Sequence, residues 1–218
     1  DYIDDDKIDL TAMQENLSSY KGKTSTSSPS PHEWENAFGD ADVVFCITIT
    51  SSLSGTYNSA VIAKDIYEHN HTGRKVYVLD SLSTGPEIAL FIEKIAELIK
   101  AGFAPDDIYK TLLEYKDKTH LYFSLASLNN FAKNGRISPV IAAGIGLLGV
   151  RVVGKASDEG TLLPLDKCRG EKRALKKLID HLKECGYTDG KIIIAHNNNE
   201  AGALAVSYTH LTLPTNPR

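Results

Sequence analysis

Residues 42–60 read DVVFCITITSSLSGTYNSA. A continuous apolar and largely β-branched run ends at a group of hydroxyl residues around one glycine, and apolar residues at helical spacing follow. The run predicts a strand over residues 42–50 that is buried on both faces, as strands of parallel sheets are. The residues after it predict a helix over 57–69. The stretch therefore predicts a strand, a loop and a helix, which is the repeating unit of an α/β fold.

The same alternation continues along the first half of the chain. KVYVL at 75–79 predicts a second strand, and helices are predicted over 32–38, 86–101 and 104–118. Strands that alternate with helices predict a parallel sheet with right-handed crossovers.

The composition changes in the second half of the chain. We expect further strands at 121–125, 150–155, 161–164 and 191–195, a turn at Asp158-Glu159-Gly160, and helices at 139–148 and 170–185. We therefore predict an α/β protein with two lobes: an N-terminal parallel-sheet domain over 1–125 and a second α/β lobe over 126–206.

Composition excludes several classes of function. The chain has 218 residues, a formal net charge of −4 and a pI near 6.0, which argues against a nucleic-acid partner. The longest apolar runs are too short to span a membrane. Three cysteines without a C-x-x-C pair suggest a reduced, intracellular protein. Cys46 lies in an apolar strand and is expected to pack in the core, because such surroundings raise a thiol pKa.

Neither end of the sequence reads as a natural end. The chain begins at Asp1 without Met, and residues 207–218, SYTHLTLPTNPR, continue no helical or strand period. One codon spelling of SYTHLTLPT resembles a transposase-end adapter used in sequencing libraries. We therefore expect a non-native tail after Val206. A natural polar tail is the alternative.

The hydroxyl residues at 51–56 have two readings. Backbone N–H groups at a helix start attract anions, Gly55 allows close approach, and Ser54 and Thr56 add donors, which would suit a carboxylate or a phosphate. Alternatively, Ser54 or Thr56 only caps the helix. The letters lack a P-loop Lys and a G-x-S-x-G elbow, and the histidines show no triad or metal spacing. Spacing alone favours neither reading.

Several motifs occur together in order. TSSPSP at 26–31, SSLSGTYNSA at 51–60 and DS at 80–81 resemble the TSQPSP, SSxLSGTYxSA and DS segments of the DegV family. LNNFAKNGRIS at 128–138 and CRGEK at 168–172 resemble its LxxLxxGGRIS and RGxKK segments. The resemblance runs from Tyr2 to Ala205.

The resemblance implies a two-domain α/β protein that encloses one long-chain fatty acid between its lobes. Such proteins present the carboxylate to a separate ATP-dependent fatty-acid kinase, which makes an acyl phosphate for phospholipid synthesis. By resemblance, Thr26 and Ser54 would bind the carboxylate, and Ser52, Gly55 and Thr56 would complete the ligand site. The chain would be a cytoplasmic carrier with no catalytic residue, metal or cofactor of its own, apart from the bound fatty acid.

By the same resemblance, Arg136 would contact the kinase. Charge-assisted hydroxyl donors and a helix N-terminus could offset carboxylate desolvation without a side-chain cation beside them. Residues 140–150 and the helix face at 88–99 are candidate walls of an apolar tunnel, although ordinary core packing would explain them equally well.

The sequence also departs from the family pattern. Ser28 replaces a Gln, and Asn134 replaces the first Gly of GGR. The family's first strand would precede Asp1, and its histidine near the carboxylate would follow Val206, because His196 lies too early for that role.

Two other functions stay open. A Ser-dependent hydrolase could use Ser54 or Ser52 as its nucleophile. An anion-responsive interaction module could bind a protein through Arg136 and the basic residues of 169–177.

Overall fold

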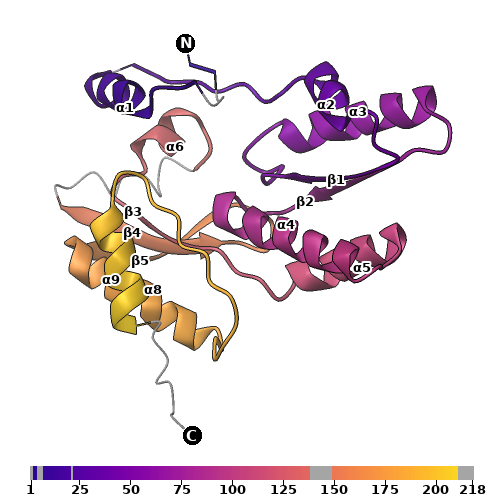
Figure 1. Cartoon of the computed structure of the whole chain (residues 1–218). Coiled ribbons are helices and arrows are strands. Elements are labelled where there is room, and N and C mark those ends of the chain that lie inside the picture. The colour runs from indigo at the N-terminus through magenta and orange to yellow at the C-terminus, as the bar shows by residue number, and fades with distance from the viewer. Residues whose placement is uncertain (1, 4–6, 21, 138–148, 211–218) are drawn as a thin grey trace, which may run out of the picture.

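The computed structural model describes residues 2–3, 7–20, 22–137 and 149–210 (Figure 1). Two sheets organise this part of the chain: a parallel pair, β1-β2, and an antiparallel sheet in the order β3-β4-β5. Each sheet carries its own helices, so the chain forms two lobes. The predicted two-lobed α/β fold is confirmed.

The first lobe forms around residues 42–60. Strand β1 (Val43–Thr48) pairs in parallel with β2 (Lys75–Asp80), from Val43 opposite Lys75 to Thr48 opposite Asp80. Helix α3 (Thr56–Asn70) makes the crossover between them. Because the strands are parallel and in step, the loops that follow β1 and β2 meet at the same edge of the sheet.

Both faces of this sheet are covered, as predicted. Helices α2 (Pro31–Phe38) and α3 pack on one face, and α4 (Gly85–Lys100) and α5 (Pro105–Lys116) pack on the other. Successive residues of β1 alternate between the two cores, because strand side chains point alternately to opposite faces. The first core contains Phe38, Cys46, Ala60, Ala63, Tyr67, Val76 and Val78. The second contains Leu79, Phe91, Ile95, Leu98, Ile108 and Leu112.

Helix α2 begins with a capping box. The Glu33 N–H donates to Ser30 Oγ at 3.3 Å, and the Ser30 N–H donates to the Glu33 carboxylate at 2.6 Å. Hydrogen bonds from the Ser30 backbone and then from its hydroxyl hold the pKa of Glu33 below its usual value. Pro31 at the first helical position fixes φ at a helical value. This cap sets where the hydroxyl-rich segment before α2 ends.

The second lobe is a sheet of three strands between helices. It consists of β3 (Tyr122–Leu125), β4 (Val150–Ala156) and β5 (Leu162–Arg169), with α6 (Asn129–Lys133) and α8 (Glu171–Glu184) on opposite faces (Figure 1). Val152 packs toward α6, and its neighbour Val153 packs toward α8. Because β3 pairs with β4, the second sheet takes in residues 122–125; the domain boundaries stay a prediction.

Two differences from the expected elements concern strands. The strand predicted at 191–195 is wrong: these residues lie as irregular structure and pair with none of the five described strands. An apolar run becomes a strand only where a neighbouring backbone supplies hydrogen bonds. Strand β5 continues to Arg169, well beyond the predicted end, because β4 pairs with its whole length. The helix predicted at 139–148 lies outside the described residues.

Two further differences concern the helices near the ends of the chain. Helix α1 (Leu10–Ser19) was not anticipated; Asp9 begins it by accepting a hydrogen bond from the Ala12 N–H at 2.9 Å. Helix α9 (Glu200–His210) continues through residues 207–210, where we expected no helical continuation. These four residues include no Pro or Gly, and extending an existing helix adds a backbone hydrogen bond for each residue fixed.

Candidate functional site

The loop between β1 and α3 carries most of the predicted ligand residues. The Thr50 N–H donates to the Ser83 carbonyl at 2.9 Å, which joins this loop to the loop after β2. Asp80 at the end of β2 also serves both loops, because its carboxylate accepts from the Ser51 N–H at 3.2 Å and from the Leu82 N–H at 3.1 Å. The two loops therefore form one hydrogen-bonded unit at the sheet edge.

Ser54, Gly55 and Thr56 form the start of α3. Ser54 Oγ lies 2.7 Å from Thr56 Oγ1 and accepts from the Thr56 N–H at 3.3 Å. Gly55 occupies the N-cap position and has no side chain with which to cap the helix itself. Both hydroxyl side chains are half-buried, whereas Gly55 is exposed. Ser54 thus has a partial capping role, and the two hydroxyls together also suit an anion at the helix N-terminus.

The hydroxyl segment before α2 lies beside this helix start. Ser59 Oγ of α3 donates to the Pro29 carbonyl at 2.5 Å, which ties the segment to the helix. A Cβ atom placed on Gly55 would lie 3.5 Å from Ser28 Oγ. Ser28, the residue that replaces the family's Gln, therefore adjoins the exposed glycine.

Thr26 of this segment contacts the second lobe. Arg136 Nη2 donates to Thr26 Oγ1 at 3.0 Å. We expected the hydroxyl cluster to act without a side-chain cation beside it, and the structure differs, because the Arg136 guanidinium lies against one of its members. Thr26 is exposed and Arg136 is half-buried, so a ligand or partner can reach the pair.

The end of α6 places Arg136. Gly135 has φ of +68°, a conformation that favours glycine, and the Arg136 N–H donates to the Phe131 carbonyl at 2.9 Å. Ile137 is buried directly afterwards and anchors the turn. Asn134 has φ of −94°, which any residue adopts, so the backbone does not require the family's first Gly at this position.

Ser52 is directed elsewhere. Its Oγ donates to the Glu159 carbonyl at 2.5 Å, in the turn that joins β4 and β5. The structure thus brings Ser54, Gly55 and Thr56 together and pairs Thr26 with Arg136, while Ser52 joins the two lobes. The sequence predicted the turn at 158–160 but carried no signal that it meets Ser52, because the partners lie 107 residues apart.

Of the two candidate tunnel walls, the structure describes the helix face at 88–99 but only the end of the segment at 140–150. On α4, Phe91, Ile95 and Leu98 pack in the core of the first lobe, whereas Ile92 and Ile99 are each 55% exposed. Most of the other wall, residues 140–148, lies outside the described part of the chain. The apolar tunnel therefore stays a prediction.

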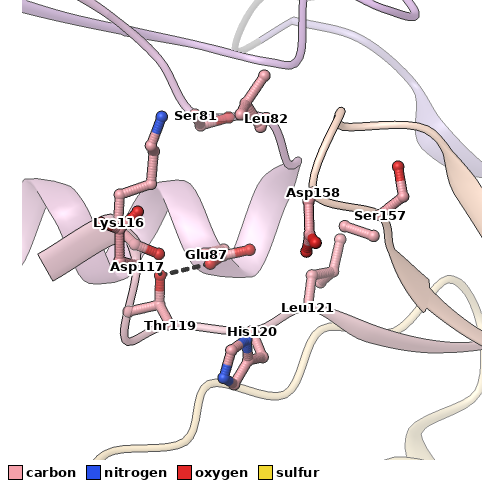
Figure 2. Close-up of a pocket in the computed structure, with 11 residues that line it drawn as sticks. Ser81, Leu82, Glu87, Lys116, Asp117, Thr119, His120, Leu121, Ser157 and Asp158 are labelled. Carbon is pink, nitrogen blue, oxygen red and sulfur yellow. Dashed lines mark hydrogen bonds between the residues drawn. The ribbon is translucent and has the colours of Figure 1, made fainter. Parts of the chain in front are cut away.

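A polar cavity of about 210 Å³ lies between the lobes (Figure 2). Its walls come from the β2–α4 loop, the α5–β3 connection and the β4–β5 turn. Glu87 of α4 is buried on one side and accepts a hydrogen bond from the Thr119 hydroxyl, and Asp158 of the turn lies on the other side. The predicted hydroxyl cluster does not line this cavity.

The described residues contain no cluster of three or more His, Cys, Asp or Glu side chains suited to a metal ion, and none of their helices has the length and apolar character that a membrane span requires. Burial raises the pKa of Cys46 to about 12, so its prediction as a packing residue is confirmed.

A family model and a curated relative both match most of the chain, and both are of the DegV family. A family model described as "Uncharacterised protein, DegV family" matches residues 1–211. A DegV domain-containing protein of Streptococcus pneumoniae is 41% identical over 199 residues, which make up 91% of this chain and 71% of the relative.

Two solved structures match the fold closely. A DegV family protein from Eubacterium eligens, loaded with heptadecanoic acid, has a TM-score of 0.92 and 41% identity, and the match covers 96% of this chain and 78% of that one. The Fatty Acid Kinase (Fak) B3 protein of Streptococcus pneumoniae, loaded with linoleic acid, has a TM-score of 0.92 and 40% identity, with 94% and 73% covered.

Proposed function

Because the chain belongs to the DegV family, we propose that it binds one long-chain fatty acid and presents the carboxylate to a separate ATP-dependent fatty-acid kinase. The observation that carries the proposal is the TM-score of 0.92 to two structures that hold fatty acids. In this proposal the protein is a cytoplasmic lipid carrier, and the kinase performs the chemical step.

The carboxylate is assigned to the hydroxyl cluster. A buried carboxylate needs several hydrogen-bond donors, and donors to an ionised group are stronger than those to a neutral one. The Ser54–Thr56 pair and the exposed helix start at Gly55 offer such donors on one side. Thr26 offers its hydroxyl proton from the neighbouring segment, because its oxygen already accepts from Arg136.

Arg136 is assigned to the contact with the kinase. The Fak B3 name of one structural neighbour points to a kinase partner for that protein. Arg136 adjoins Thr26 at a half-buried position, so a partner that approached the carboxylate would meet its charge. The guanidinium can also balance negative charge on a phosphoryl group during transfer.

The hydrolase alternative finds less support. A serine nucleophile needs a base within hydrogen-bond distance. In the described part of the chain, Ser54 Oγ pairs with Thr56 and Ser52 Oγ with a backbone carbonyl, and neither hydroxyl is hydrogen-bonded to a histidine. Covalent labelling of Ser54 by a fluorophosphonate would favour the hydrolase over the carrier.

Native mass spectrometry of the purified protein, followed by denaturing extraction, tests fatty-acid binding. We expect a retained mass that matches a fatty acid. Ser54→Ala and Thr26→Ala should each weaken binding roughly 10- to 150-fold, since a hydrogen bond to a charged group is worth about 1.5–3 kcal/mol. Ser25→Ala, an exposed hydroxyl of the same segment, serves as the matched control. A protein that arrives empty and binds no added fatty acid would refute the proposal.

The kinase assignment has its own test. With a purified fatty-acid kinase, ATP and saturating fatty acid, Arg136→Ala should lower the rate of acyl-phosphate formation at least about tenfold, whereas Arg169→Ala, at an exposed basic position, should not. If Arg136→Ala retains the full rate, Arg136 has no role with the kinase. If the kinase binds equally well with and without fatty acid, the interaction-module reading gains support.

A further inference from the structure

The turn between β4 and β5 packs directly on the loops of the first lobe. Gly160 has φ of +73°, and a Cβ atom placed on it would lie 2.1 Å from Thr50 Oγ1 and 2.9 Å from Leu82 Cα. Real Cβ atoms do not approach other atoms so closely, and one of these neighbours is backbone. Only a glycine therefore fits at this contact between the second lobe and the loops after β1 and β2.

The turn is internally rigid. Ser157 Oγ accepts hydrogen bonds from the Glu159 N–H at 3.2 Å and from the Thr161 N–H at 3.1 Å. The Gly160 N–H donates to the Ser157 carbonyl at 2.9 Å. Since its backbone is held by its own hydrogen bonds, the turn can support another segment without changing shape itself.

The supported segment leads directly into the hydroxyl cluster. Thr50 Oγ1, the atom nearest to Gly160, accepts from the Ser52 N–H at 3.2 Å, and Ser52 Oγ donates back to the Glu159 carbonyl at 2.5 Å. Leu82, the other neighbour of Gly160, is held at φ of +52° although it is not a glycine. Surroundings that fix such an unfavourable backbone often mark a functional site.

We propose that the turn formed by residues 157–160 is a positioning element for the ligand site, with Gly160 as its essential residue. The turn holds residues 50–54 in the arrangement that presents Ser54 and Thr56 to the carboxylate. The second lobe thereby sets the affinity of a site whose ligand groups belong largely to the first lobe. This inference rests on the proposed fatty-acid binding.

Gly160→Ala tests the proposal against a matched variant, Gly102→Ala. Gly102 has φ of +79°, so alanine meets the same backbone conflict there, but nothing lies within 4 Å of its added Cβ. We expect both variants to lower the melting temperature. Only Gly160→Ala should weaken fatty-acid binding, by about tenfold or more, while Gly102→Ala stays within about twofold of the parent.

Amide hydrogen exchange supplies a readout that a general loss of stability would not reproduce. Peptides that span residues 50–56 should exchange faster in Gly160→Ala than in Gly102→Ala, because the Ser52 N–H donates to Thr50 Oγ1, the atom that a Cβ on residue 160 would displace. Ser157→Ala, which removes the hydrogen bonds of the Ser157 hydroxyl and leaves the backbone bond from Gly160 in place, should give a smaller change in the same direction. If Gly160→Ala does not fold, the binding and exchange of Ser157→Ala test the positioning role of the turn.

The outcomes separate the two proposals. If the parent protein binds no fatty acid, the proposed function fails. If the parent binds and Gly160→Ala and Ser157→Ala bind equally well, with unchanged exchange at residues 50–56, the positioning role is overturned and the proposed function stands.

Discussion

Tyr67 joins the first core to the loop before β1. Its ring is 1% exposed, and its hydroxyl lies 2.9 Å from the carbonyl oxygens of Gly39 and Ala41 and accepts from Arg74 at 3.0 Å. Tyr67→Phe removes the hydroxyl that makes these half-buried hydrogen bonds. Gly39 and Ala41 lie at exposed positions, where water can replace the lost partner, so the free energy of unfolding should fall by about 0.5–1.5 kcal/mol. Urea denaturation measures the loss. Tyr20→Phe, at 57% exposure, is the control, and equal losses would contradict the prediction.

The three cysteines differ in their surroundings. Burial raises the pKa of Cys46 to about 12 and also raises the pKa of buried Cys168, whereas Cys185 is exposed. A raised pKa means less thiolate at a given pH, so Cys46 should react more slowly than Cys185. Iodoacetamide should modify Cys185 in the native protein and all three cysteines in urea. Intact-mass measurement checks this, and rapid native modification of Cys46 would refute it.

The sequence predicted the hydroxyl residues of the site but not their contacts. Ser54, Gly55 and Thr56 lie within three positions of one another, so local spacing was enough to group them. The partnership of Thr26 and Arg136 spans 110 residues and depends on how the two lobes meet. No local pattern encodes such a meeting. The same holds for Gly160: the need for a glycine at this position arises from its contacts with Thr50 and Leu82, which the sequence of the turn does not reveal.

Among the helices, α2 has the most complete start signal. Ser30 and Glu33 satisfy each other's backbone N–H groups. Ser30→Ala should destabilise the protein by about 1 kcal/mol, as loss of an N-cap residue typically does. Chemical denaturation of Ser30→Ala beside Ser27→Ala, which changes an exposed hydroxyl outside the helix, checks this. A loss no larger than that of Ser27→Ala would show that the cap is dispensable.

The helices and strands that could be predicted from the sequence are those whose own residues carry the signal for them. Helices α2 to α5 carry prolines near their starts or clear periodicity, and β1 and β2 carry continuous apolar runs. The run at 191–195 carries the same signal, yet it has no strand partner in the described part of the chain. Helix α1 illustrates the opposite case, because its apolar face is weak and residues such as Leu10 and Leu17 remain exposed.

In the whole molecule, several polar contacts join the two lobes. They include the hydrogen bond between Arg136 and Thr26, the bond from Ser52 to the β4–β5 turn, and the Lys191–Glu93 ion pair. The ion pair is solvent-exposed and contributes little. Polar interfaces of this kind permit relative motion of the lobes, and a ligand that binds only the folded protein adds to its stability.

A bound fatty acid should therefore stabilise the molecule measurably. At a free ligand concentration of 100 times Kd, binding adds about 2.7 kcal/mol to the free energy of unfolding. The fatty alcohol of the same length has the same alkyl chain and no carboxylate, so it should stabilise much less. Thermal unfolding with each ligand gives the comparison. Equal stabilisation by the two would show that the hydroxyl cluster does not recognise the carboxylate.

The distance along the chain between Ser52 and its support in the second lobe also has a consequence in time. On the ribosome, Ser52 is made 107 residues before Glu159, which at 5–20 residues per second is an interval of about 5 to 20 seconds. Strands β1 and β2 can pair within that interval, but the loop beside them still lacks the turn that holds it. In the proposed function, with the proposed role of the turn, the order of synthesis makes lipid capture a late step that waits until the second lobe has been translated.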